Sequence, residues 1–276
     1  MTEFIKQPQT DKILTNLKTK KLGKRNAIFH EIGSTNTYLK GVAAVLDDGF
    51  TVISASQTGG RGRLGKTFES PPGGLYMSVL IKDLHGEDVA SATVKAAVAV
   101  CEALEEYLGL PEETLGIKWV NDILYDGKKL CGILCEFVRT EKGDCLIIGI
   151  GVNILSTSDI LSEAIKDSVC GLADVAQAEN IKGGAKGISE YAREEVCAQI
   201  LGKLEKHLYQ KLENCIDAYR DRSVVVGKDI YVIKGGETKP AHAYGITDDA
   251  KLCVHYGDGR FEMLGSGDVS IRRTNV

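Results

Sequence analysis

The sequence predicts an α+β protein: a mixed, mainly antiparallel sheet covered by helices, followed by a small β-barrel of SH3-like size. Apolar strand-like runs between residues 51 and 153, two long segments with apolar residues at helical spacing, and five short alternating strands after residue 227 predict these parts. The 276 residues suffice for one large domain and one small one. We therefore divide the chain into an N-terminal extension (1–28), a main domain (29–224) and a C-terminal domain (225–276).

The main domain begins with a strand and a helix whose first residues carry hydrogen-bonding side chains. The strand covers Phe29–Ile32, and Ser34-Thr35-Asn36 supplies capping-type residues ahead of the apolar positions of the helix. Ser34 and Thr35 either cap the helix alone or also exchange hydrogen bonds with a small polar ligand. The sequence leaves both roles open.

Two apolar strands and a long helix follow. The strands Thr51–Ala55 and Leu75–Ile81 lie on either side of a basic loop. Glu87–Leu108 has the wide apolar stripe of a helix that packs on a sheet. A second long helix is predicted over Ser189–Leu212, after a looser region at 159–187 that includes a glycine-rich loop.

A three-stranded meander stands between these two helices. We predict its strands over Ile117–Tyr125, Leu130–Val138 and Cys145–Asn153. Asp126-Gly127 between the first two is a strong short-range hairpin signal, because both residues accept positive φ. The strands are apolar on both faces, which indicates a central place in a covered sheet.

Polar residues in this meander are candidates for function. Lys129 begins an otherwise apolar strand, where a lysine needs an anionic partner or must reach solvent. Asn121 and Asp122 interrupt the first strand and Asn153 ends the third. Asn121 and Asp122 fit either a turn or polar network, or a site.

The basic loop Gln57–Thr67 contains four glycines within seven residues and three cations. Glycine lets the backbone approach a ligand closely, and arginine offers a planar fork of donors to carboxylates and phosphates. The loop also matches the spacing of a dinucleotide fingerprint and of a P-loop, but both need a helix directly afterwards. Pro71-Pro72-Gly73-Gly74 follows instead, so we expect a loop that closes over an anion.

Composition excludes several classes of protein. The net charge of −4 lacks the basic excess of a nucleic-acid binder, and no apolar run reaches the length of a membrane helix. The start of the chain has no signal-peptide pattern. Eight cysteines without a Cys-x-x-Cys pair indicate reduced core residues and a cytoplasmic protein, without a disulfide framework or zinc site.

Five short alternating strands form the C-terminal domain. Paired glycines and aspartates separate them, as expected of a small barrel. We place them near residues 229–233, 241–246, 252–256, 260–264 and 268–272.

Taken together, these segments resemble the biotin protein ligases (biotin–[acetyl-CoA-carboxylase] ligases), in the form without an N-terminal DNA-binding domain. The resemblance covers about Phe29 to Arg272. Five blocks in order carry it: Ser34-Thr35-Asn36, Gly60-Arg61-Gly62-Arg63 with Leu75-Tyr76, Lys118-Trp119-x-Asn121-Asp122, Lys129-Leu130-x-Gly132-Ile133-Leu134-x-Glu136 and Gly149-Ile150-Gly151-Val152-Asn153. Lys66, Phe68, Val120 and Asp268 stand where the family often has Arg, Trp, Pro and Glu.

The resemblance implies a class II synthetase-like fold and an activity. Such an enzyme joins biotin to ATP, giving biotinyl-5′-AMP, and passes biotin to a lysine of a biotin carboxyl carrier domain of a carboxylase. It implies ATP, Mg²⁺ and biotin as cofactors and substrates, with no metal ligand assigned. It implies no nucleic-acid or membrane partner and allows a homodimer.

The resemblance also implies roles for single residues. Arg63 and Lys129 would be catalytic, since cations must offset the repulsion between a carboxylate and a triphosphate. Biotin would contact Ser34, Thr35, Asn36, Gln57, Gly60, Arg61, Gly62, Arg63, Lys129 and Gly132. ATP would contact Arg63, Lys66, Trp119, Asn121 and Asn153.

Two other functions compete with this hypothesis. A lipoate–protein ligase would share the fold and the chemistry, but the Gly-Arg-Gly-Arg loop and the C-terminal barrel favour biotin. A non-catalytic biotin sensor would have no need for Arg61, Arg63 and Lys129 together.

Overall fold

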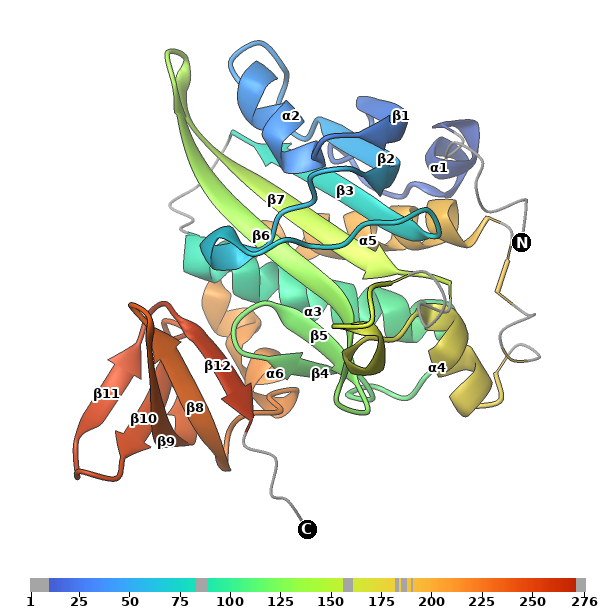
Figure 1. The fold of residues 1–276 in the computed structure, drawn as a ribbon. Helices are drawn as coiled ribbons and strands as arrows, with labels where there is room; N and C mark the ends of the chain where they lie inside the picture. The colour runs from blue at the N-terminus through green and yellow to red at the C-terminus, as the bar shows by residue number, and fades with distance from the viewer. Residues whose placement is uncertain are drawn as a thin grey trace.

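Two β-sheets organise the chain (Figure 1). The computed structural model describes residues 10–82, 89–155, 161–181, 184, 188–189 and 191–271. The first sheet has seven strands in the order β1-β2-β3-β7-β6-β5-β4. Its strands are β1 (Asn26–Ile32), β2 (Thr51–Gln57), β3 (Gly74–Ile81), β4 (Gly116–Lys118), β5 (Asp122–Tyr125), β6 (Lys128–Thr140) and β7 (Gly143–Asn153). Only β1 and β2 pair in parallel, so the predicted mixed, mainly antiparallel sheet is confirmed.

Helices cover this sheet unequally. The long helices α3 (Val89–Leu108) and α5 (Ala192–Leu208) pack together beneath one face, and α2 (Thr35–Val42) contacts β2, β3 and β7 on the other (Figure 1). The alternation of side chains along each strand matches these two layers. In β3, Leu75, Met77 and Val79 belong to the core under α3 and α5, while Leu80 packs with Leu39 of α2.

The sheet face that carries α2 departs from the apolar pattern at one place. Successive outward positions are Gly149 and Gly151 in β7 and Gly132 in β6, where an ordinary covered strand would carry large apolar residues. A space for a ligand is therefore built into the strands themselves.

The N-terminal residues that the structure describes belong to the core of the main domain. Helix α1 (Thr10–Asn16) packs on α5, and Ile13 and Leu22 are fully buried. The carboxylate of Glu205 accepts hydrogen bonds from three successive backbone amides, of residues 20 to 22, at 2.6–2.8 Å. This carboxylate fastens the segment to α5.

The C-terminal residues form a second, antiparallel sheet with the order β11-β10-β9-β8-β12. All five predicted strands are confirmed, with sizes typical of an SH3-like domain. They are β8 (Lys228–Lys234), β9 (Glu237–Ile246), β10 (Leu252–Tyr256), β11 (Phe261–Leu264) and β12 (Asp268–Ile271).

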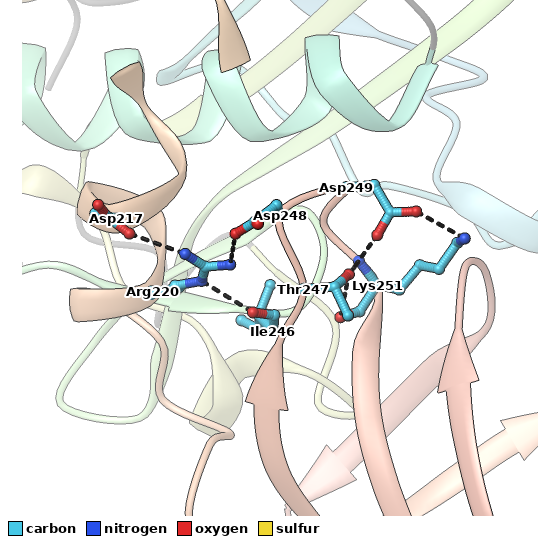
Figure 2. A network of polar contacts seen from close by, with 7 residues as sticks. All are labelled: Asp217, Arg220, Ile246, Thr247, Asp248, Asp249 and Lys251. Carbon is cyan, nitrogen blue, oxygen red and sulfur yellow. Dashed lines mark hydrogen bonds and ion pairs between the residues drawn. The ribbon is translucent and has the colours of Figure 1, made fainter. Parts of the chain in front are cut away.

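A polar network joins this sheet to the main domain (Figure 2). Arg220 of α6 (Ile216–Asp221) donates to the carbonyl of Ile246 at 2.9 Å and pairs with Asp217 and Asp248. Asp249 binds Thr247 and Lys251 and so shapes the loop between β9 and β10. The network holds that loop against α6.

Some predicted elements differ from the structure. The expected single strand Ile117–Tyr125 is two short strands, β4 and β5, which reverse direction between Trp119 and Asn121. Tertiary contacts fix this reversal: Trp119 Nε1 donates to the carbonyl of Ala250 at 3.0 Å, and the Tyr219 hydroxyl donates to the carbonyl of Val120 at 3.0 Å.

Other differences concern helix ends. The helix expected over Ser189–Leu212 stops at Leu208, and α6 follows it after a turn. Helix α4 (Leu172–Ala178) lies in the region expected to be loose. The predicted loop at 183–187 falls outside the described residues except for Gly184. All eight cysteines are free, and seven of them are buried, as predicted.

Candidate active site

A pocket lies on the face of the first sheet that carries α2. Its cavity volume is about 170 Å³, and its walls come from the start of α2, from the basic loop and from the start of β12. We call residues 58–73 the covering loop. Eleven residues predicted from the sequence line the pocket: Ser34, Thr35, Asn36, Gln57, Arg61, Gly62, Arg63, Lys66, Asn121, Lys129 and Gly132.

The floor of the pocket includes three strand glycines at which a Cβ atom would crowd the side chains that lie on the sheet. A Cβ atom at Gly149 would lie 2.2 Å from Asn36 Oδ1, and one at Gly151 would lie 2.7 Å from the ring of Phe68. A Cβ atom at Gly132 would lie 2.8 Å from the same ring. The glycines therefore let polar and aromatic side chains lie directly on the sheet.

A connected set of polar side chains forms one end wall. Gln57 Oε1 accepts from the backbone amide of Thr35 at 2.9 Å and from its hydroxyl at 3.2 Å. The Ser78 hydroxyl lies 2.7 Å from Thr35 Oγ1 and 2.5 Å from Asn36 Oδ1. Ser34 caps α2 by accepting from the amide of Thr37 at 3.4 Å, which confirms the capping role. It also lines the pocket, and its contact with a ligand stays a prediction.

The opposite wall carries cations whose side chains point to a common region. Arg63 Nη1 donates to Asn121 Oδ1 at 3.2 Å, and Asn121 Nδ2 donates to the carbonyl of Ile133 at 2.7 Å. Lys129 Nζ lies 2.7 Å from Asp122 Oδ1 and 5.4 Å from the centre of the Phe68 ring. Asp122 is the anionic partner that a lysine at this position requires.

The covering loop also reaches the C-terminal sheet. Lys66 forms an ion pair with Asp268, the first residue of β12, and Asp268 and Lys118 line the same pocket. Burial alone would raise the pKa of Asp268, but the hydrogen bond from Lys66 and the charges of Lys118 and Lys66 hold it below its ordinary value. The Asp268 carboxylate is therefore ionised at neutral pH.

A second, larger pocket of about 640 Å³ adjoins the first. The two share Thr67, Phe68, Lys118, Asp122 and Lys129, so these side chains stand between them. One ligand can therefore meet another across a wall that contains two lysines.

Three predicted residues do not line the first pocket. Trp119 is 2 % exposed and donates to the carbonyl of Ala250 in the loop between β9 and β10, so the structure does not bring its side chain to the pocket. Asn153 lines the second pocket, and its amide donates to the carbonyl of Cys170 at 3.2 Å. Gly60 is a buried residue of the covering loop, and a Cβ atom there would come within 2.3 Å of the Phe68 carbonyl.

Comparison with known proteins shows which proteins the chain is similar to. Residues 28–153 match the model of the biotin/lipoate A/B protein ligase family. The solved structure "Biotin protein ligase from Aquifex aeolicus in complex with biotin and ATP" superposes with a TM-score of 0.74 and 25 % identity, over 91 % of this chain and 100 % of that one. Over residues 28–153, fewer than half of its 276 residues, the chain is similar to this family, and over most of its length it shares the fold of a biotin protein ligase.

Curated relatives agree with this similarity. The biotin–[acetyl-CoA-carboxylase] ligase of Mycobacterium tuberculosis is 27 % identical over 87 % of this chain and 86 % of that protein. The bifunctional ligase/repressor BirA of Bacillus subtilis is 33 % identical over 63 % of this chain, a match that spans 54 % of that protein. This chain therefore spans about half the length of some of the ligases that it matches.

Sequence reasoning assigned no role to several residues of this ligase pocket. Ser78 is one of them, although a serine in an apolar strand signals a polar neighbour. The structure shows that this neighbour is Thr35. Gly149, Gly151 and Lys118 stand in recognisable blocks but were given no role. Glu136 stands in the fourth of the resembling blocks without a role of its own, and the structure places it beside Asn36 and Arg61.

Proposed function

We propose that the chain is an ATP-dependent biotin–protein ligase. It joins biotin and ATP into biotinyl-5′-AMP and pyrophosphate, and then transfers the biotinyl group to one lysine of a biotin carboxyl carrier domain. The observation that carries this proposal is the pair of adjoining pockets that share Lys129, Lys118 and Phe68. The family and the biotin ligases among its relatives support the choice of biotin.

Adenylation requires two anions to meet. A carboxylate oxygen of biotin attacks the α-phosphorus of ATP, the bond to the bridging oxygen breaks, and pyrophosphate leaves with the electron pair. Biotin is the nucleophile, so the protein needs to supply positioning and positive charge rather than a nucleophile of its own. Lys129 supplies that charge at the shared wall, and Arg63 supplies it from the first pocket.

We assign the acid to the first pocket and the nucleotide to the second. The end wall of Thr35, Asn36, Gln57 and Ser78 offers both donors and acceptors, which suits a neutral ureido group. Asn153 lines the larger pocket, as expected of a residue that contacts the nucleotide.

Transfer uses the same closed pocket. The amine of the acceptor lysine attacks the acyl carbon of biotinyl-5′-AMP, the carbon–oxygen bond breaks, and AMP leaves while the amine loses a proton. The mixed anhydride is labile in water, and the covering loop shields it until the acceptor arrives.

Magnesium enters this reaction as part of the substrate MgATP. Within the ranges that the structure describes, no three His, Cys, Asp or Glu side chains are grouped to hold a metal ion. Mg²⁺ commonly binds through phosphates with one or two carboxylates, and Asp122 lines both pockets. We therefore assign Mg²⁺ to the triphosphate, with Asp122 near it.

An exchange assay tests the choice of acid. The enzyme is incubated with ATP, Mg²⁺ and labelled pyrophosphate, together with biotin or with lipoate. We expect label to enter ATP with biotin and not with lipoate. Exchange with lipoate alone would make the chain a lipoate ligase, and exchange with neither acid would contradict adenylation.

The acceptor and the location of the protein follow from the relatives and the composition. Helices long and apolar enough to cross a membrane are absent from the described part of the chain. The acceptor is proposed to be a carrier domain of a biotin-dependent carboxylase, because the Mycobacterium tuberculosis relative is named for that acceptor. We further propose a cytoplasmic location and no nucleic-acid partner, as the composition indicated.

A further inference from the structure

Glu136 on β6 has no part in the proposed chemistry, yet it connects three elements around the pocket. Its Oε2 accepts from Asn36 Nδ2 at 2.9 Å, and its Oε1 accepts from Lys40 Nζ at 2.5 Å. Arg61 Nη2 of the covering loop lies 3.6 Å from the same Oε1. The Glu136 side chain is 17 % exposed, so α2, β6 and the covering loop meet at a largely buried carboxylate.

The loop is built to move as one piece with Arg61. Arg61 and Thr67 form a β-bridge, the amide of Gly62 donates to the carbonyl of Lys66 at 2.7 Å, and the amide of Phe68 donates to the carbonyl of Gly60 at 3.0 Å. These contacts make residues 60–68 of the covering loop a small hairpin. A contact that holds Arg61 therefore also holds Arg63 and Lys66, which lie in the same hairpin.

The three cations of this hairpin end on three different partners. Arg63 binds Asn121 and Lys66 binds Asp268, and both pairs face the pocket, where an incoming anion competes for them. Arg61 is held instead by a carboxylate at the end of the pocket next to α2. This anchor can persist while the other two cations turn to substrate.

Glu136 also reaches the residues that face the acid. Asn36 binds the Glu136 carboxylate with its amide nitrogen, and its Oδ1 accepts from the Ser78 hydroxyl above Gly149. Burial would raise the pKa of Glu136, but the hydrogen bonds from Lys40 and Asn36 and the charge of Arg61 keep it below its ordinary value. One ionised group thus orders both the end wall and the loop.

We propose that Glu136 is a positioning residue that docks the covering loop through Arg61 and couples loop closure to the orientation of Asn36. It touches no substrate. Its catalytic consequence rests on the proposed function, whereas docking of the loop is a property of the protein alone and is testable without substrates.

The test compares Glu136→Gln with Lys40→Gln. Both variants break an ion pair of the same carboxylate, but only the first removes the partner of Arg61. Tryptic cleavage after Arg63 and after Lys66, two sites that every variant retains, is followed by mass spectrometry without ligand. Loss of a partly exposed ion pair should speed cleavage in Glu136→Gln by roughly two- to fivefold, and leave Lys40→Gln near the wild type.

Arg61→Gln removes the same ion pair by changing its partner in the covering loop. It keeps the test valid if Glu136→Gln misfolds. We expect it to show the same rise in cleavage, and the double variant to show no additional rise, because both changes remove one interaction. Equal cleavage of Glu136→Gln and Lys40→Gln, or additive effects in the double variant, would overturn the proposal.

A kinetic measurement then addresses catalysis. Glu136→Gln should raise KM for biotin and hasten escape of biotinyl-5′-AMP, and change kcat of pyrophosphate exchange less than KM. A fall in kcat at unchanged KM would contradict a positioning role. If neither variant nor wild type catalyses exchange, the proposed function fails, while the protease result still decides the docking.

Discussion

Lys129→Ala should separate activity from stability. Lys129 Nζ lies 2.7 Å from Asp122 Oδ1, and the two side chains are 29 % and 20 % exposed. An ion pair this exposed contributes about 0.2–1 kcal/mol to folding, so the variant should unfold close to the wild type. A charge-assisted contact made to the transition state is instead worth ~2.7–4 kcal/mol, or about 10²–10³ in rate.

The assay is biotin-dependent pyrophosphate exchange, with a denaturant titration on the same preparations. Lys142→Ala is the matched control, because Lys142 is exposed at the far tip of the same β6–β7 hairpin. We expect Lys129→Ala to lose exchange and keep its unfolding midpoint, and the control to change neither. Near-normal exchange by Lys129→Ala would refute the assignment of Lys129 to the reacting carboxylate.

Three further predictions follow from the same geometry. Arg61→Gly should release biotinyl-5′-AMP early and biotinylate serum albumin more than the wild type does, because the loop loses its anchor to β6; equal blots would disprove retention by Arg61. Gly149→Ala should weaken biotin binding and folding by about 1–3 kcal/mol, since its Cβ would lie 2.2 Å from Asn36, whereas Gly245→Ala in open space should do neither. Trp119→Phe should lower the unfolding free energy by about 1–3 kcal/mol in a melt followed by circular dichroism, because it leaves the carbonyl of the buried residue Ala250, in the loop between β9 and β10, unpaired; an unchanged melt would show that this bond does not hold the loop.

Local patterns predicted the elements well where local physics decides them. Asp126 and Gly127 both have positive φ, 46° and 73°, and they form the predicted hairpin turn. The five alternating strands after residue 227 are all present. Ser34 begins α2 because a side-chain cap is a contact between close neighbours in sequence.

Contacts between distant residues decided what the patterns missed. The run from Ile117 to Tyr125 reads as one strand, but Trp119 and Tyr219 bind partners far away in sequence and reverse the chain there. The same reversal turns Asn121 and Asp122 toward the pocket. Asn121 and Asp122 each hold a cation, as members of a polar network, and both line the pocket. Their contact with a ligand stays a prediction.

The site could be predicted in its residue types more than in its connections. Eleven of the predicted residues share one pocket, because the blocks that name them end on the same face of the sheet. The link from Asn36 through Glu136 to Arg61 has two steps, between residues 100 and 75 positions apart, and no local pattern records it. The ion pair of Lys66 and Asp268 likewise depends on how the two sheets meet.

The most direct test of the proposed function is mass spectrometry of an isolated biotin carboxyl carrier domain after incubation with the enzyme, biotin, ATP and Mg²⁺. The account predicts a mass increase of one biotinyl group on a single lysine, dependent on ATP and absent with Lys129→Ala. An unmodified carrier domain, or the same modification by Lys129→Ala, would contradict it.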